Sequence, residues 1–319
     1  MAETETAPSK RQGRRLLILI AVGLVLLGAA LFVRRYYLRF PLAGEGPAGP
    51  EVPRESFQKH WTTRKVLVLG LGDSITAGLG APKDHAFFDR LVKNPEDEFP
   101  DMKGICLSAV FPNLEVENLS VSGTTSLQHM ESQIPRIRQQ PSDVLGVVIL
   151  TTGGNDLIHP YGHGRPHEGA MYGATLEQAR PWTQSFEKRL DEMISRIEAC
   201  FPGGCHIFIG NIYDPTDGWG PAAVPTAPEW PDAIAILAAY NDTIARCAER
   251  HPTVHLVDIH TPFLGHGFRC DHFWYRHYDR KAPYFWYYLN VEDPNDRGHD
   301  AIRRLFLLSI LKVLHTSAQ

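Results

Sequence analysis

Apolar and polar residues alternate along the chain in two patterns. Short runs rich in valine, leucine and isoleucine recur from residue 66 onward, and longer amphipathic stretches separate them. The first pattern is typical of buried strands and the second of surface helices. The predicted strands are 66–70, 114–121, 144–150, 206–211 and 254–259, and the predicted helices are 84–93, 126–139, 182–200, 232–250 and 297–314.

This order of elements predicts the fold class. Strand and helix take turns, and the strands are almost continuously apolar, which indicates a parallel sheet covered by helices on both faces. We therefore predict an α/β protein with a three-layer flavodoxin-like fold and a central five-stranded parallel sheet. In such sheets the active residues gather where the carboxyl ends of the strands meet the following loops.

The N-terminal region has a different pattern. Residues 16–33 are uncharged and almost wholly apolar, and at about 1.5 Å per residue they make a helix of about 27 Å, close to the hydrocarbon thickness of a bilayer. A cleaved signal peptide is the alternative, but its apolar region is usually shorter and ends in small residues, whereas Arg34 and Arg35 follow here. We expect a single-span anchor, with the N-terminus in the cytoplasm and the folded domain outside.

The composition predicts four parts along the chain. We expect residues 1–15 to be a basic cytoplasmic segment and residues 16–33 to be the transmembrane anchor. Residues 34–61, rich in proline and glycine between 41 and 53, are expected to be a linker, and 62–319 the folded domain.

Charge and cysteine content exclude some function classes. The net charge is only −4 and no basic stripe lies outside the N-terminus, so we expect no nucleic-acid partner. The five cysteines fit no C-x-x-C pattern, and the histidines have no zinc-site spacing, so no metal and no cofactor are predicted. Cys200 and Cys205 could form a disulfide in an oxidising compartment.

A polar segment follows the first predicted strand. Residues 70–78 read Gly-Leu-Gly-Asp-Ser-Ile-Thr-Ala-Gly. They do not fit the dinucleotide pattern G-x-G-x-x-G, because Ile75 holds the third glycine position, nor the nucleophile elbow G-x-S-x-G, because Thr76 holds the last one. Ser74 is either a helix-capping serine or a nucleophile at a helix N-terminus, where free N–H groups favour an anion.

Two further polar segments follow the second and third strands. They are Asn-Leu-Ser-Val-Ser-Gly-Thr-Thr at 118–125 and Thr-Thr-Gly-Gly-Asn-Asp at 151–156. Gly123 alone could be a turn glycine and Asn155 alone a strand-end cap. Their order on successive strand ends favours a shared site.

Together the three segments resemble the first three blocks of the SGNH (GDSL-like) serine hydrolases, with a resemblance that spans about 66–314. It implies that Ser74 is the nucleophile and that an oxyanion hole is formed by the backbone N–H groups of Ser74 and Gly123 and the side-chain amide of Asn155. The implied reaction is hydrolysis of a carboxylic ester, in a lipid, an acetylated sugar or a short-chain ester, through an acyl-enzyme.

The chain departs from the family in the fourth block. The family pattern D-x-x-H-P-N is replaced by Asn-Val-Glu-Asp-Pro-Asn at 290–295, so Asp293 stands in the histidine position and Asn290 in the aspartate position. The pair Asp296-x-x-His299 follows at the same spacing. We expect His299 to be the base and Asp296 to orient it, with the histidines of 260–277 (His266, His272 and His277) as the alternative source.

The replaced block also keeps a second function open, a catalytically impaired binding module for lipid or glycan on the same fold. The aromatic stretch between 273 and 288 could wall a substrate pocket or pack on the last helix.

Overall fold

The computed structural model describes residues 10–224 and 227–315 and divides the chain into two units, Met1–Pro41 and Leu42–Gln319. The first unit is one helix, α1 (Lys10–Tyr36), and Gly13–Tyr36 is long and apolar enough to cross a membrane. Its apolar side chains from Leu16 to Val33 are exposed. These properties suit a membrane anchor or a signal sequence.

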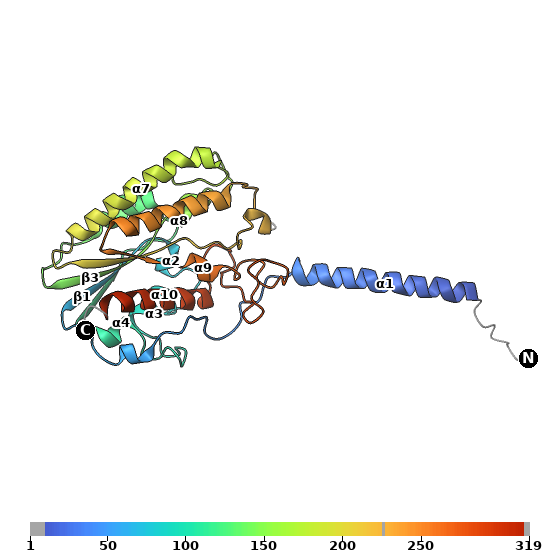
Figure 1. Cartoon of the computed structure of the whole chain (residues 1–319), viewed down its shortest axis with the longest axis horizontal. Coiled ribbons are helices and arrows are strands. Elements are labelled where there is room, and N and C mark those ends of the chain that lie inside the picture. The colour runs from blue at the N-terminus through green and yellow to red at the C-terminus, as the bar shows by residue number, and fades with distance from the viewer. Residues whose placement is uncertain (1–9, 225–226, 316–319) are drawn as a thin grey trace, which may run out of the picture. The chain divides into compact units, whose positions relative to one another are not determined.

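The second unit is built on one parallel sheet (Figure 1). The strands lie in the order β2-β1-β3-β4-β5, which is the flavodoxin-like order, and every neighbouring pair is parallel. The predicted fold class is therefore confirmed. The strands are β1 (Lys65–Leu71), β2 (Leu114–Asn118), β3 (Val144–Thr151), β4 (Cys205–Gly210) and β5 (Val254–Val257).

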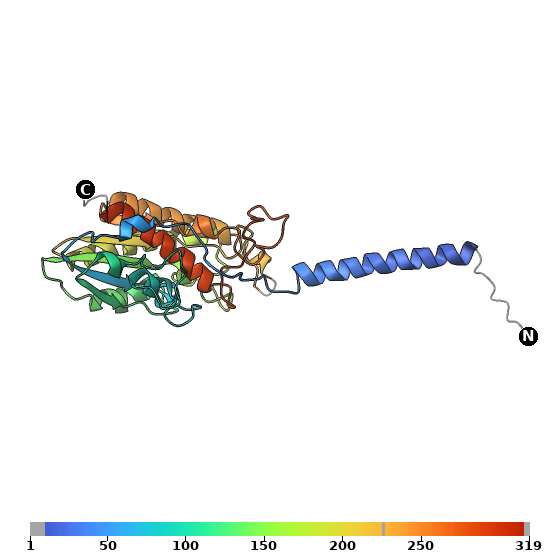
Figure 2. The ribbon, with the colours of Figure 1, turned by 90° about the horizontal axis from the view of Figure 1, so that it is seen from below.

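Helices cover both faces of the sheet. The long helices α7 (Leu176–Ala199) and α8 (Ala233–Arg250) lie on one face, and α3 (Phe87–Val92) and α10 (Asp296–Leu314) on the other (Figure 1). The turned view shows α10 crossing its face of the sheet (Figure 2). Short elements complete the unit: η1 (Arg54–Phe57), α2 (Ser74–Ala77), α4 (Leu107–Val110), α5 (Ser126–Gln128), η2 (His129–Gln133), η3 (Ile134–Arg136), α6 (Gly154–Ile158), η4 (Pro221–Ala223) and α9 (His260–Phe263).

The single helix predicted over 126–139 is broken into three short pieces. A π-helical turn, η2, and a 3-10 turn, η3, follow α5. Pro135 has no N–H to continue an α-helix, which explains the early end. The irregular backbone leaves Gln133 buried beside the loop after β1.

The predicted bounds of the linker, residues 34–61, are wrong from residue 42 onward. The folded unit begins at Leu42, and the backbone carbonyl of Leu42 accepts a hydrogen bond from the N–H of Phe285 at 2.8 Å. Phe57 and Trp61 are buried in the core on the α10 face. The few apolar residues of this segment cannot form a core alone, but they add to one that the sheet and α10 already make. The predicted start at Thr62 is therefore corrected to Leu42.

The cysteines are not cross-linked. All five are free thiols, and Cys200 and Cys205 form no disulfide.

The aromatic run at the end of the predicted 273–288 stretch packs inward, because Phe285, Trp286 and Tyr287 are buried in the core that contains Phe306. Packing thus explains this part of the stretch.

Candidate active site

The loop after β1 presents Ser74 at the carboxyl edge of the sheet. Gly72 has a φ of +129°, and a Cβ there would lie 2.2 Å from the carbonyl oxygen of Thr151, so only glycine fits. Asp73 is buried and caps α2, accepting hydrogen bonds from the Ile75 N–H at 3.2 Å and the Thr151 hydroxyl at 2.9 Å. Burial raises the pKa of Asp73 to about 6. Ser74 follows as the first residue of α2 and is half-buried.

The loops after β1, β2 and β3 are tied together. The carbonyl of Gly72 accepts a hydrogen bond from the Val121 N–H at 3.0 Å, which joins the first loop to the second. The Asn155 amide donates to the carbonyl of Thr124 at 2.9 Å, which joins the third loop to the second. Gly123, with a φ of +80°, lies in that second loop and is exposed. The three predicted segments therefore converge on one edge of the sheet.

Sequence reasoning missed the polar residues that support these loops. Gln133 donates to the carbonyl of Gly72 at 2.7 Å and accepts from its N–H at 2.8 Å. His129 is buried between the hydroxyls of Thr152, at 3.0 Å, and Thr124, at 2.9 Å. Burial lowers the pKa of His129 to about 4, so the ring is neutral. Both residues lie in the irregular stretch after α5, and no motif in the sequence marks them.

The structure does not bring the expected pair, Asp296 and His299, to Ser74. The Phe87 N–H donates to Nδ1 of His299 at 3.1 Å, so Nε2 carries the proton and donates to the carbonyl of Leu79 at 2.9 Å. Burial lowers the pKa of this fully buried ring to about 4.

Asp296 has partners of its own. Its carboxylate contacts Nδ1 of His85 at 3.0 Å and a guanidinium nitrogen of Arg90 at 3.1 Å. Both ring nitrogens of His299 are used by backbone groups, so neither is left for the carboxylate or for Ser74. The pair expected from spacing is thus replaced by two separate structural contacts.

The residue of the fourth block that lies beside Ser74 is Asp293, because both line the same cavity. Burial raises the pKa of the Asp293 carboxyl, and its interaction with the Ser74 side chain lowers it. The side-chain amide of Asn290 donates to Oδ2 of Asp293 at 2.6 Å. The two residues that depart from the family pattern therefore stand beside the expected nucleophile.

The histidines of 260–277 are also used elsewhere. Nδ1 of His266 bonds to the carbonyl of Tyr284 at 2.9 Å, and its ring stacks on Trp286 with centroids 3.6 Å apart. Nδ1 of His272 lies 2.9 Å from the carboxylate of Asp271. Among the described residues, no histidine, His277 included, lines the cavity beside Ser74.

That cavity has a volume of about 230 Å³ and reaches from Ser74 toward α8. Asp73, Ser74, Asn155 and Asp293 are among the polar residues that line it. The remainder is mostly apolar, with Leu157, Ile158, Tyr172, Ile212, Trp230, Ala233, Ile234 and Leu237 among the lining residues. The cavity that Ser74 lines is therefore mostly apolar, and we call it the apolar chamber.

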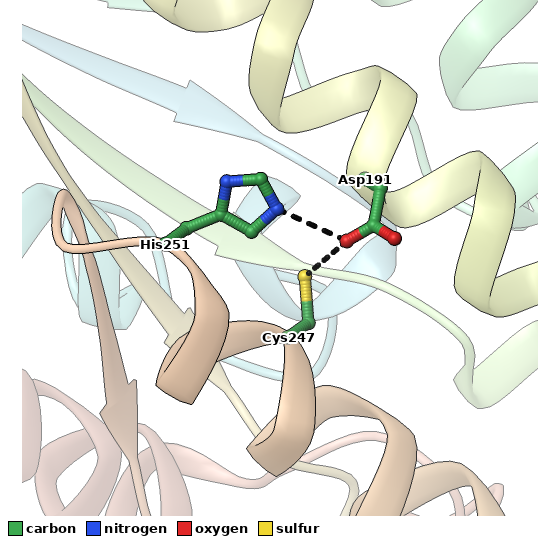
Figure 3. A group of neighbouring side chains, drawn as sticks. All are labelled: Asp191, Cys247 and His251. Carbon is green, nitrogen blue, oxygen red and sulfur yellow. Dashed lines mark hydrogen bonds and ion pairs between the residues drawn. The ribbon is translucent and has the colours of Figure 1, made fainter.

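A separate cluster of potential metal ligands lies between α7 and α8 (Figure 3). Oδ1 of Asp191 is 3.0 Å from Nε2 of His251 and 3.4 Å from the sulfur of Cys247. Arg250 contacts both oxygens of Asp191 at 2.9 and 3.0 Å, so the carboxylate already has a cation. Burial raises the pKa of Cys247 to about 12, which opposes the thiolate that a metal needs. The cluster is an ion-pair network between two helices.

The sheet order, the serine at the end of β1 and the convergent loops define an SGNH-type α/β hydrolase fold. The chain belongs to the GDSL-like lipase/acylhydrolase family, whose model matches residues 71–301. Membership supports ester hydrolysis as the general chemistry of the site.

Several solved structures resemble the chain, all with low sequence identity. An extracellular lipase from Streptomyces rimosus is 19% identical over 80% of this chain and 100% of its own, with a TM-score of 0.46. Phospholipase A1 from Streptomyces albidoflavus is 16% identical over 77% and 98%, with a TM-score of 0.47. An acetylxylan esterase from Geobacillus stearothermophilus is 16% identical over 78% and 94%, with a TM-score of 0.47. No curated protein matches the sequence.

Proposed function

We propose that this protein is a serine ester hydrolase whose nucleophile is Ser74 and whose reaction passes through an acyl-enzyme. The observation that carries the proposal is the shared cavity, which is lined by Ser74, by Asn155 and by the Asp293 carboxylate that the Asn290 amide holds. A nucleophile, an oxyanion donor and a proton acceptor at one cavity are the parts that acyl transfer requires.

The oxyanion would be stabilised by three donors. The backbone N–H groups of Ser74 and Gly123 and the side chain of Asn155 are the expected groups. The Asn155 amide has two N–H bonds, and because Thr124 accepts only one of them, the second remains for the substrate oxygen. The bond to Thr124 also holds the amide in place before the substrate arrives, as preorganised stabilisation requires.

The apolar chamber favours an ester with an apolar acyl group. Ile158, Trp230 and Leu237 offer a substrate mainly hydrocarbon and aromatic surface. The volume of about 230 Å³ lies below the roughly 300–1,000 Å³ of pockets for drug-sized ligands, so a chain of moderate length fits better than a large one. Lipid or short-to-medium-chain esters are therefore favoured over acetylated sugars as substrates.

A fluorophosphonate probe tests the nucleophile. The intact protein is expected to be labelled, and Ser74→Ala is expected to abolish labelling, while Ser195→Ala on the exposed face of α7 serves as the matched control. Absence of labelling in the intact protein would favour the alternative, a binding module for lipid or glycan.

A series of p-nitrophenyl esters from acetate to dodecanoate tests the acyl group. We expect kcat/KM to rise from acetate to a medium-length chain, and we expect Ala233→Trp, which fills the chamber, to shift the optimum to shorter chains. A preference for acetate in the intact protein would contradict the apolar acyl group and leave the serine mechanism standing.

We also propose that residues 16–33 anchor the enzyme in a membrane, with the N-terminus in the cytoplasm and the catalytic domain outside. The support is the exposed apolar helix Gly13–Tyr36 with basic residues at both ends. Intact mass of the mature protein separates an anchor from a cleaved signal, and protease accessibility in sealed vesicles tests the orientation.

A further inference from the structure

We propose that Asp293, held by Asn290, is the general base of Ser74 and takes the place of the imidazole of other serine hydrolases. The inference rests on the proposed function and names its proton acceptor. Asp293 is only 2% exposed, lines the same cavity as Ser74 and receives the Asn290 amide, and its carboxyl is close enough to Ser74 for the serine side chain to lower its pKa. A base must lie within hydrogen-bond reach of the hydroxyl whose proton it removes.

The loop fixes the carboxylate from two sides. The side-chain oxygen Oδ1 of Asn290 accepts hydrogen bonds from the backbone N–H groups of Glu292, at 3.3 Å, and Asp293, at 3.2 Å. These bonds orient the amide, so its NH₂ group points to Oδ2 of Asp293 at 2.6 Å. A carboxylate has acceptor positions for several hydrogen bonds and can receive the amide and the serine at once.

The chemistry of the two residues matches as a pair. An imidazole base needs an acceptor at its second nitrogen, which an aspartate provides. A carboxylate base needs no fixed tautomer and is instead oriented by a donor, which an asparagine amide provides. If aspartate replaced the histidine of the family pattern while the aspartate three residues earlier stayed, two carboxylates would face each other. Asparagine at position 290 avoids this repulsion, so the two departures from the pattern complement each other.

The surroundings set the proton affinity of the base. The titratable groups that interact with Asp293 are the carboxyls of Asp73 and Glu292 and the phenols of Tyr161 and Tyr213. Burial raises the pKa of Asp293, while the hydrogen bonds from Ser74 and Asn290 lower it. The negative charge of Asp293 is one of the causes that raise the pKa of Asp73, after burial.

The proton and the electrons balance in both half-reactions. The Ser74 oxygen forms a bond to the ester carbonyl carbon as its proton moves to the Asp293 carboxylate. The tetrahedral intermediate then breaks its bond to the alkoxide, which leaves with that proton as the alcohol. Water then attacks the acyl-enzyme carbonyl and gives a proton to Asp293. The bond to the Ser74 oxygen breaks, that oxygen takes the proton from Asp293, and the acid, the free serine and the carboxylate result.

The first test replaces the carboxylate by an amide of the same shape. Asp293→Asn is expected to lower kcat on p-nitrophenyl hexanoate, and the rate of fluorophosphonate labelling, by about 10²- to 10⁴-fold, the range for loss of a general base. Asp143→Asn, an exposed aspartate before β3, is the matched control and is expected to keep full activity. Activity of Asp293→Asn within threefold of the wild type would overturn the proposal while the serine mechanism stood.

The second test converts the site to the family pattern. In Asn290→Asp/Asp293→His an imidazole becomes the base, so the acid limb of the pH–rate profile is expected to move upward toward about 6.5. If the acid limb of the pH–rate profile lies at the same pH in this variant as in the wild type, the residue at position 293 does not titrate in the reaction. If the intact protein showed neither hydrolysis nor labelling, the proposed function itself would be wrong.

A third variant leaves the carboxylate in place, and this keeps the proposal testable if Asp293→Asn does not fold. In Asn290→Ala the amide donor is lost, and because that donor lowers the pKa of Asp293, the acid limb is expected to shift to higher pH. An unchanged limb would mean that Asn290 does not position or tune the base.

Discussion

The loops after the first three strands and the segment before α10 supply the two halves of the proposed site, yet only the first half was predicted from sequence. Ser74, Gly123 and Asn155 follow the ends of β1, β2 and β3, which are neighbours in the sheet. Parallel pairing alone brings their loops to one edge. The position of residues 290–299 depends on how an irregular loop packs, and spacing does not determine that.

His299 and Asp293 show the difference most clearly. His299 serves as hydrogen-bond partner to two backbone groups, the carbonyl of Leu79 in the loop after α2 and the N–H of Phe87, the first residue of α3. Buried backbone groups need such partners, so this histidine completes the fold. Asp293 comes six residues earlier and faces Ser74. The D-x-x-H spacing was therefore a poor guide to which residue lies beside Ser74.

The largest expected effect concerns the nucleophile. Ser74→Ala is expected to lower kcat by about 10⁴-fold or more, because the covalent step is lost and only binding and the oxyanion donors remain. Steady-state hydrolysis of p-nitrophenyl hexanoate measures the effect. Turnover within tenfold of the wild type would show that Ser74 is an N-terminal helix residue without chemical use.

The next effect concerns the oxyanion donor. Asn155→Ala is expected to reduce kcat by about 10² to 10³, or roughly 3 to 4 kcal/mol of transition-state stabilisation. Because the amide also holds the loop of Thr124, the measurement should include KM and the thermal midpoint. A loss of less than threefold in kcat would contradict this role.

The sequence predicted the architecture well for a physical reason. The apolar runs of β1, β3 and β4 are buried strands, as the sequence predicted, whereas β2 and β5 at the edges of the sheet are partly exposed. The observed bounds of the strands differ from the predicted ones by a few residues. The broken helix after α5, the packing of residues 42–61 and the partners of His299 could not be predicted. They depend on tertiary contacts, such as those of Gln133 with Gly72, that no local pattern encodes.

A smaller effect concerns stability and pH. The pKa of His299 is about 4 in the folded protein against 6.5 ordinarily, so its neutral form stabilises the fold above pH 6.5. That stabilisation is lost as the pH falls from 6.5 toward 4, because the unfolded chain takes up the proton first. Between pH 7 and 5 the loss is about 2 kcal/mol, an order-of-magnitude figure.

Other groups titrate in the same range, so a difference measurement is needed. His129 acts in the same direction, whereas Asp73, whose pKa is raised to about 6, contributes stability at low pH that is lost as the pH rises. Urea unfolding of the wild type and His299→Gln at several pH values isolates His299. The two free energies of unfolding are expected to approach each other toward pH 5, and a constant gap would show that this histidine is not buried as a neutral ring.

The smallest expected effect on kcat is that of Asp296→Asn, and its comparison with Asp293→Asn tests the two acidic residues directly. Asp296→Asn removes a carboxylate that pairs with His85 and Arg90, and it is expected to change kcat per folded molecule by less than about threefold. Asp293→Asn makes the same chemical change three residues earlier, where the carboxylate lines the same cavity as Ser74. Measured side by side, with the folded fraction taken from circular dichroism, the two variants separate an ion pair that supports the fold from a group that handles the proton. A large kcat loss in Asp296→Asn with little loss in Asp293→Asn would reverse that assignment and return the catalytic role to Asp296 and His299.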